Sequence, residues 1–124
     1  MTTTGQRNLE VAARYELLYN TDIERFVREV YTADCVVYCM GGPTIRGTDD
    51  FLKVEQTVFK AAPQRRMRVV HRHASGDAVV VEAVVTDAAR GADWELPFVA
   101  VLTCRDGKIH TDRSYADWSR WPGL

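Results

Sequence analysis

The side chains best suited to acid/base chemistry in this sequence are two tyrosines, a histidine and an aspartate. Tyr15 and Tyr19 are four residues apart, so a helix would place both hydroxyls on one face, where they could orient a carbonyl group. An imidazole titrates near neutral pH, which makes His71 the candidate general acid or base. Asp112 is expected on an inward strand face, where burial would raise its pKa unless a histidine pairs with it. We therefore predict His71, Asp112 and Tyr15 as catalytic residues.

Each of these residues also has a structural interpretation. Tyr15 and Tyr19 could be core aromatics whose hydroxyls reach water or a carbonyl oxygen. His71 could be a hydrogen-bonded structural histidine, and Asp112 an exposed acid at a strand end. The sequence alone leaves both interpretations open.

Two histidines on one strand face could also ligate a metal. His71 and His73 alternate along the chain, but a zinc site needs further ligands, and only Asp112 or His110 could converge with them. We therefore expect neither a metal nor a cofactor.

The elements that must position these residues begin with helices. Apolar residues recur at spacings of three and four between residues 8 and 20, which predicts an amphipathic helix. Thr21 opens a capping box for a second helix. The β-branched and aromatic segment 35–40 predicts a strand. Thr48 is the expected cap of a third helix, which stops near Pro63.

The second half of the chain predicts four strands. Short turns containing glycine separate them at residues 75–77, 89–91 and 105–108, which is typical of an antiparallel meander. Pro97 falls inside the third strand and predicts a bulge or bend there. Helices followed by a meander favour an α+β fold, with a curved antiparallel sheet around three N-terminal helices.

Strand alternation predicts which residues face the enclosed side of this sheet. The inward positions include Met67 and Val69, and tight hairpins would bring His71 level with Ser114. The residues expected to contact a substrate from helix and strands are Tyr19, Val81, Ala83, Val99, Val101 and Ser114.

The opposite, convex face of the predicted sheet is too apolar to face water. Trp94, Leu96, Phe98 and Leu102 follow one strand side there. Apolar patches of this kind mark interfaces, so we predict a homodimer through the convex face. The C-terminal Trp118 and Trp121 should pack over the sheet or across the dimer.

Composition restricts the class of protein. A chain of 124 residues is the size of one domain, expected to span residues 1–124. The net charge of −1 argues against a nucleic-acid partner, and no apolar stretch is long enough to predict a membrane span. Cys35, Cys39 and Cys104 match no zinc motif and are expected as reduced thiols in the cytoplasm.

The order of elements resembles the nuclear transport factor 2-like superfamily, and within it the SnoaL-like branch. The segments similar to that superfamily are Arg14-Tyr15, Asn20-Thr21-Asp22, Ala33-Asp34-Cys35-Val36, Ile45-Arg46-Gly47-Thr48, Asp106-Gly107-Lys108-Ile109 and the closing run from Asp112 to Asp117. The superfamily includes steroid delta-isomerases, limonene epoxide hydrolases, scytalone dehydratases and polyketide cyclases. The resemblance implies a cone-shaped fold enclosing a pocket, but one fold hosts many chemistries.

The catalytic sets of two relatives are missing. The resemblance places the isomerase carboxylates near Cys39 and Val99, and neither residue can replace an acid. The epoxide hydrolase set falls on Ala83, Val85 and Ser114. The resemblance also places Cys39 among the substrate-binding positions.

Two functions follow from these observations. The first is a cofactor-free acid/base enzyme, an isomerase, cyclase, dehydratase or hydrolase, acting on an apolar polyketide-, terpenoid- or steroid-like molecule. The second is a non-catalytic ligand-binding or dimeric interaction module with the same pocket. The missing carboxylates favour the second function, and the inward histidine and aspartate favour the first.

Overall fold

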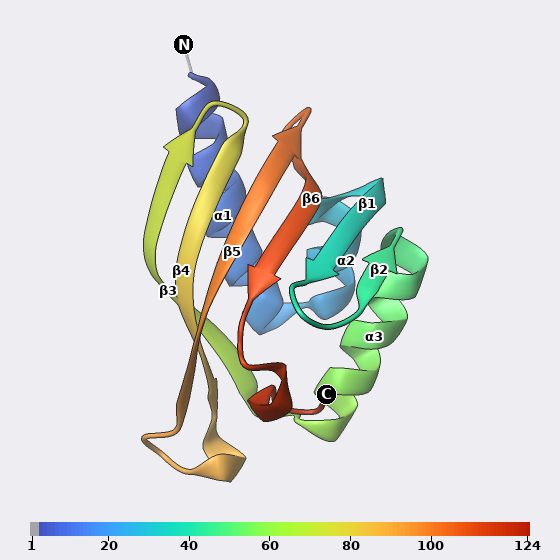
Figure 1. Cartoon of the computed structure of the whole chain (residues 1–124), viewed down its shortest axis with the longest axis vertical. Helices are drawn as coiled ribbons and strands as arrows, with labels where there is room; N and C mark the ends of the chain where they lie inside the picture. Colours follow the sequence, from blue (N-terminus) through green and yellow to red (C-terminus); the bar gives the residue numbers. More distant parts are fainter. Residues whose placement is uncertain (1–2) are drawn as a thin grey trace.

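Three helices pack against the concave side of one six-stranded sheet (Figure 1). The computed structural model describes residues 3–124. This arrangement confirms the predicted α+β fold with a curved sheet around the helices. The elements are α1 (Thr4–Thr21), α2 (Ile23–Val30), β1 (Tyr31–Cys39), β2 (Thr44–Arg46), α3 (Thr48–Ala61), β3 (Arg65–Ser75), β4 (Ala78–Asp87), β5 (Glu95–Arg105) and β6 (Lys108–Tyr115), with short 3₁₀ turns at Ala88–Arg90 and Trp118–Arg120.

The helices begin at caps that differ from the predicted ones. Thr3 and Gln6 form a capping box, so α1 begins at Thr4 rather than at residue 8. The side chain of Asp22, not Thr21, caps α2 by accepting from the backbone N–H of Arg25. Helix α3 begins after Gly47 without a side-chain cap.

The sheet is mixed rather than wholly antiparallel. Its strand order is β2-β1-β6-β5-β4-β3, and β1 pairs with β6 in parallel while the other neighbours are antiparallel. Although β6 is the last strand in the sequence, it lies in the interior of the sheet, between β1 and β5 (Figure 1). The inward side chains of β6, among them Asp112 and Ser114, therefore lie near the centre of the concave side.

A bulge in β3 changes which side chains of the second half of the strand face the core. Val69 pairs with Ala83 and His71 pairs with Glu82, so Val70 is an extra residue on β3. Before the bulge Met67 faces the core, and after it His71 shares the convex face with Glu82. The prediction that His71 faces inward is wrong because strand parity changes at Val70.

The register of β5 also differs from the prediction by one residue. The chain between β4 and β5 is a longer connection with a 3₁₀ turn, and it pairs Val85 with Leu96. The inward residues of β5 are consequently Leu96, Phe98, Ala100 and Leu102, all buried. Pro97 causes no bulge, because β4 and β5 pair continuously through it and β6 joins β5 only from Val99 onward.

Aromatic rings fill the space between the sheet and the helices. The ring of Phe26 lies 5.3 Å from that of Tyr15, 5.2 Å from Tyr19 and 5.4 Å from Tyr31, with tilted or edge-on geometry. Phe51 adds a further ring 4.9 Å from Tyr31. In the described part of the chain, no helix is long and apolar enough to cross a membrane.

This cluster predicts a large loss of stability on truncating Phe26. Its side chain is almost wholly buried, so Phe26→Ala should lower the free energy of unfolding by about 3–5 kcal/mol through lost burial and a cavity. Leu17→Ala is the matched control, because Leu17 lies exposed on α1 and its truncation should change stability by less than about 0.5 kcal/mol. Urea unfolding measures both, and similar losses would contradict the central position of Phe26.

Candidate functional site

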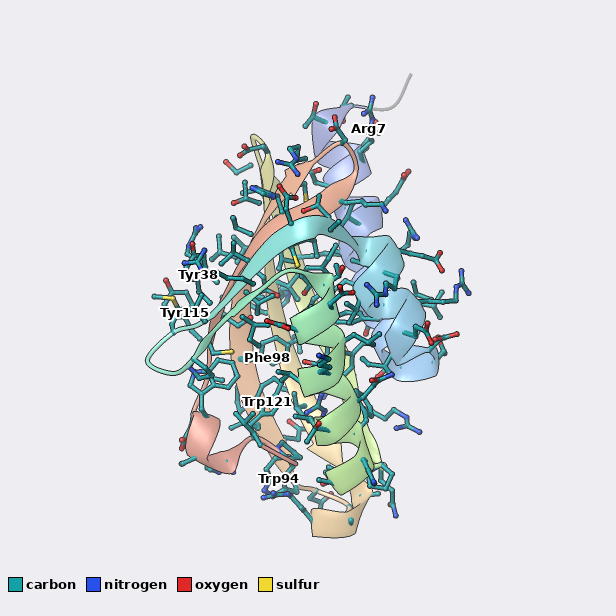
Figure 2. All side chains as sticks on the ribbon, turned by 90° about the vertical axis from the view of Figure 1, so that its right-hand side faces the viewer. Arg7, Tyr38, Trp94, Phe98, Tyr115 and Trp121 are labelled. Carbon is teal, nitrogen blue, oxygen red and sulfur yellow. The ribbon has the colours of Figure 1, made fainter. Side chains whose placement is uncertain are left out.

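The concave side forms a partly open cavity of about 190 Å³ between the sheet, α1, α3 and the C-terminal segment. Aromatic and aliphatic side chains form most of its wall, and the few polar groups come from Tyr15, Tyr19, Tyr31, Glu55, Asp112 and Ser114. Figure 2 shows Phe98 and Trp121 on this inner side, and Tyr38 and Tyr115 on the outer side of the sheet. An apolar cavity with a few convergent polar groups is typical of a small-molecule site.

Asp112 is the acidic side chain that the sheet contributes to the cavity wall. The residue is 3% exposed, and its two carboxyl oxygens accept hydrogen bonds of 2.6 Å from the hydroxyls of Tyr31 and Ser114. Burial raises the pKa of Asp112, while the bonds from Ser114 and Tyr31 oppose the rise. A carboxyl group in this environment can exchange a proton closer to neutral pH than an exposed aspartate can.

The tyrosines remain proton donors. Burial raises the pKa of Tyr15 well above its ordinary value, and the neighbouring Asp112 adds to the rise. The same two causes raise the pKa of Tyr31. Both phenols therefore stay neutral at physiological pH. The Tyr31 hydroxyl donates to Asp112, whereas the Tyr15 hydroxyl can donate to a ligand oxygen that gains negative charge.

A buried ion pair forms the second polar region. The guanidinium of Arg65 donates to Glu55 Oε2 at 2.8 Å and to the carbonyl oxygen of Pro122 at 3.1 Å. The guanidinium carbon lies 5.1 Å from the ring centroid of Tyr19 and 5.5 Å from that of Trp121. Burial raises the pKa of Glu55, and the Arg65 charge counteracts this. Sequence reasoning missed Arg65 and Glu55 as parts of the site.

The C-terminal segment 117–124 covers one side of the cavity. Trp118 donates through Nε1 to the Met40 carbonyl at 2.9 Å, and the Trp121 ring packs edge-on against Phe98 at 5.4 Å. Gly123 approaches α3 so closely that a Cβ atom there would lie 2.3 Å from the carbonyl oxygen of Val58. The prediction that Trp118 and Trp121 pack the tail against the sheet agrees with these contacts.

Cys39 lines the cavity as a neutral thiol. Burial, with the nearby Asp112, raises the pKa of Cys39 to about 11, so little thiolate exists at neutral pH. Cys39 is therefore a wall residue and lacks the features of an activated nucleophile.

The structure brings together five of the predicted site residues. Tyr15, Tyr19, Cys39, Asp112 and Ser114 line the one cavity, and the roles assigned to them stay predictions. Of the two outcomes expected for a buried Asp112, the structure favours the raised pKa over pairing with a histidine, because Tyr31 and Ser114 are its partners.

The remaining predicted residues lie elsewhere. His71 is exposed on the convex side of β3 and does not line the cavity. Val99 and Val101 also face the convex side, because of the register of β5. Val81 and Ala83 face inward as predicted but are buried in the core beside the cavity rather than in its wall.

The alternative of a metal held by the histidines does not fit this geometry. His71 and His73 lie on the convex face, whereas Asp112 faces the concave side. Within residues 3–124, no group of three His, Cys, Asp or Glu side chains is arranged to hold a metal ion.

The buried carboxyl of Asp112 predicts a pH dependence of stability. The folded chain holds this proton more tightly than the unfolded chain, so the carboxyl favours folding most below its ordinary pKa of 3.8. That contribution is lost as the pH rises from there through the raised folded pKa. The unfolding free energy of the wild type, relative to Asp112→Asn, should fall as the pH rises above 3.8 in urea titrations at constant ionic strength. A relative stability that rises with pH would contradict the raised pKa.

The comparisons with known proteins agree with this fold. Residues 11–111 match the family model of the SnoaL-like domain, and no curated protein matches the sequence significantly. A putative SnoaL-like polyketide cyclase from Jannaschia sp. CCS1 has a similar structure, with a TM-score of 0.82 and 20% identity over 96% of this chain and 91% of that one.

Two further structures share the fold. A hypothetical protein from Catenulispora acidiphila with a ketosteroid isomerase-like fold, in complex with trimethylamine, gives a TM-score of 0.78 at 19% identity, covering 90% of this chain and 88% of that one. An LEH-like epoxide hydrolase of M. tuberculosis gives 0.72 at 16% identity, covering 96% and 89%. Since the family model matches most of the sequence, the chain belongs to the SnoaL-like family.

Proposed function

We propose that this protein is a cofactor-free acid/base enzyme that acts on an apolar, cyclic carbonyl compound in the cavity. The observation that carries the proposal is the burial of Asp112 in an apolar wall with two hydroxyl donors and, in the described chain, no ion pair. A carboxyl group with a raised pKa in a cavity is suited to move a proton.

The arrangement supports proton transfer next to a carbonyl group. Asp112 as carboxylate would take a proton from the carbon beside the carbonyl, and the electron pair would move to the carbonyl oxygen. Tyr15 would stabilise the resulting enolate by donating a hydrogen bond. Asp112 would then return the proton to carbon or to a leaving hydroxyl. Isomerisation, cyclisation and dehydration all use these steps, with Asp112 in the role first predicted for His71.

The first experiment measures exchange of carbon-bound protons. Acetophenone in D₂O exchanges its methyl protons through an enolate, and NMR follows the loss of signal. The wild type should accelerate exchange above buffer, and Asp112→Asn should lower the enzymatic rate at least ~100-fold while acetophenone binding changes by less than about tenfold. The rate should rise with pH through the raised pKa of Asp112, because the carboxylate is the base.

His71→Ala is the matched control, because His71 lies outside the cavity and its loss should leave exchange unchanged. Equal exchange in wild type and Asp112→Asn would overturn the catalytic role of Asp112. Binding without exchange would favour the alternative function, a ligand-binding module, which the missing isomerase and hydrolase carboxylates already favour.

We also propose that the convex face forms a homodimer, with residues different from those first expected. Leu96, Phe98 and Leu102 face the core, so they cannot form the interface. The outer face instead presents a shallow apolar depression lined by Val70, Val99 and the exposed ring of Tyr115, and Glu82 lies in it beside Val99. This apolar outer surface supports the prediction.

Charge placed in this depression should separate the two copies. Val99→Glu would bury a second carboxylate directly opposite Glu82, its neighbour on β4, and should give a monomer at micromolar concentration in light scattering. Leu17→Arg is the control, because Leu17 is exposed on α1 and its substitution should leave the dimer intact. A wild-type monomer would contradict the proposal.

A cytoplasmic location is proposed from the cysteines. Cys35, Cys39 and Cys104 are free thiols, and burial is the main cause that raises the pKa of each to about 11. Unpaired cysteines that are buried or half-buried are typical of a reducing compartment.

A further inference from the structure

The ionisable wall of the cavity is acidic. Among the residues that the structure describes, the wall contains the carboxyl groups of Glu55 and Asp112 and no lysine, arginine or histidine side chain. Arg65, which pairs with Glu55, is not itself part of the wall. A ligand in the cavity therefore meets two carboxyl groups, of which one internal cation balances only one.

Asp112 is the carboxyl group without a cation in contact. Its oxygens accept from the neutral hydroxyls of Tyr31 and Ser114, and Arg113 acts on it only from the opposite face of β6. Burial is the largest influence and raises the pKa of Asp112, which reflects the cost of a carboxylate without a counter-charge. A cation in the cavity would supply that counter-charge.

Aromatic rings surround this carboxyl group. Tyr31 donates to it, and the Tyr31 ring lies 5.4 Å from that of Phe26 and 4.9 Å from that of Phe51. Ring faces attract cations, and aromatic cages recognise quaternary ammonium groups. The aromatic side chains that line the cavity are Tyr15, Tyr19, Phe26, Tyr31, Phe51, Phe98, Trp118 and Trp121.

The interior already holds one organic cation in this way. The Arg65 guanidinium donates to Glu55 at 2.8 Å, and its carbon lies 4.5–5.5 Å from the ring centroids of Tyr19, Phe59 and Trp121. A carboxylate, one further acceptor and several rings thus keep a cation stable away from water in this protein. A carboxyl group and rings occur together again at Asp112, where the cavity gives a ligand access to them.

The wall favours a particular kind of cation. A buried primary ammonium group needs acceptors for three N–H donors, and the oxygens of Asp112 already accept from two hydroxyls. A quaternary or tertiary ammonium group has at most one such donor and presents alkyl groups to the apolar wall. A cavity of about 150 Å³ holds benzene, so about 190 Å³ holds a trimethylammonium group, and the open side lets a longer molecule extend outward.

We infer that the cavity binds a quaternary or tertiary ammonium ion, with its charged head among the aromatic rings and the carboxylate of Asp112 as its counter-charge. This inference goes beyond the proposed function and does not rest on it, because binding requires no proton transfer. The ammonium ion and the carbonyl compound are two classes of ligand for one cavity.

Three probes of similar shape and different charge test the inference. They are choline, its uncharged carbon analogue 3,3-dimethyl-1-butanol, and the anion 3,3-dimethylbutanoate. Isothermal titration calorimetry in mildly alkaline buffer, which favours the carboxylate of Asp112, gives Kd. The fluorescence of Trp118 and Trp121 gives an independent readout, because both rings line the cavity. The wild type should bind choline at least ~10-fold more tightly than the alcohol, and the anion more weakly than the alcohol.

Asp112→Asn isolates the counter-charge. It removes the negative charge and keeps the side-chain shape, so the preference for choline should fall below about threefold while the Kd of the alcohol changes by less than about threefold. Asp34→Asn is the matched control, because Asp34 is exposed on β1 and pairs with Arg105 outside the cavity. This control should keep the full preference. Thermal melting checks that both variants fold.

A second variant keeps the inference testable if Asp112→Asn does not fold. Trp118 is half-buried in the C-terminal segment, so Trp118→Leu should leave the core intact. It keeps an apolar side chain and removes a ring face. Choline should lose at least ~3-fold more affinity than the alcohol in this variant, whereas equal losses would count against the aromatic cage.

Four results refute the inference: equal Kd values of choline and the alcohol in the wild type, tightest binding of the anion, an undiminished preference in folded Asp112→Asn, or no binding of choline at millimolar concentration. Failure of the proposed function is a separate result. It appears as an absence of proton exchange in acetophenone, and it leaves the preference for choline unchanged.

Discussion

The burial of Arg65 is the constraint on which the cavity depends. Its side chain is wholly inaccessible to solvent, and a guanidinium cannot lose its proton to escape the cost of burial. Partners must therefore surround it. Glu55 supplies the counter-charge, the Pro122 carbonyl accepts a hydrogen bond, and the rings of Tyr19, Phe59 and Trp121 lie within 5.5 Å of the guanidinium carbon. One cation thus joins β3 to α1, α3 and the C-terminal segment, and so fixes the volume of the cavity.

The C-terminal segment 117–124 also affects the environment of Asp112, which lies on the part of the cavity wall formed by the sheet. Once the segment 117–124 covers the aromatic side chains, water has little access to Asp112, and an apolar environment strengthens every remaining electrostatic interaction. Tyr31 and Ser114 then hold the carboxyl group in one orientation. Because β6 lies between β1 and β5, its neighbours on both sides hold this orientation through the backbone.

The sequence predicted the helices, the meander and the tyrosine face because periodicity and turn residues are local signals. It failed at β3, where the extra residue Val70 reverses which side chains face inward, and no residue type marks that bulge. The predicted register of β5 was wrong for a different reason. The connection before β5 is longer than the tight turn that the prediction assumed, and this shifts the register by one residue. The greater apolarity of Leu96, Phe98 and Leu102 could have identified the inward face. Arg65 was unpredictable because its partners lie far apart in the sequence, and a basic strand usually faces water.

The two buried carboxyl groups of the cavity are suited to different tasks because only one has a counter-ion. Burial raises the pKa of both, but the Arg65 charge opposes the rise at Glu55 by direct contact. At Asp112 the rise in pKa is opposed mainly by two neutral hydroxyls, which stabilise the charged carboxylate less than a cation does. Protonating Glu55 would leave Arg65 buried without its counter-charge, whereas protonating Asp112 leaves no uncompensated cation in contact with it. The proposed proton exchange is therefore assigned to Asp112, whereas Glu55 keeps its charge to hold Arg65.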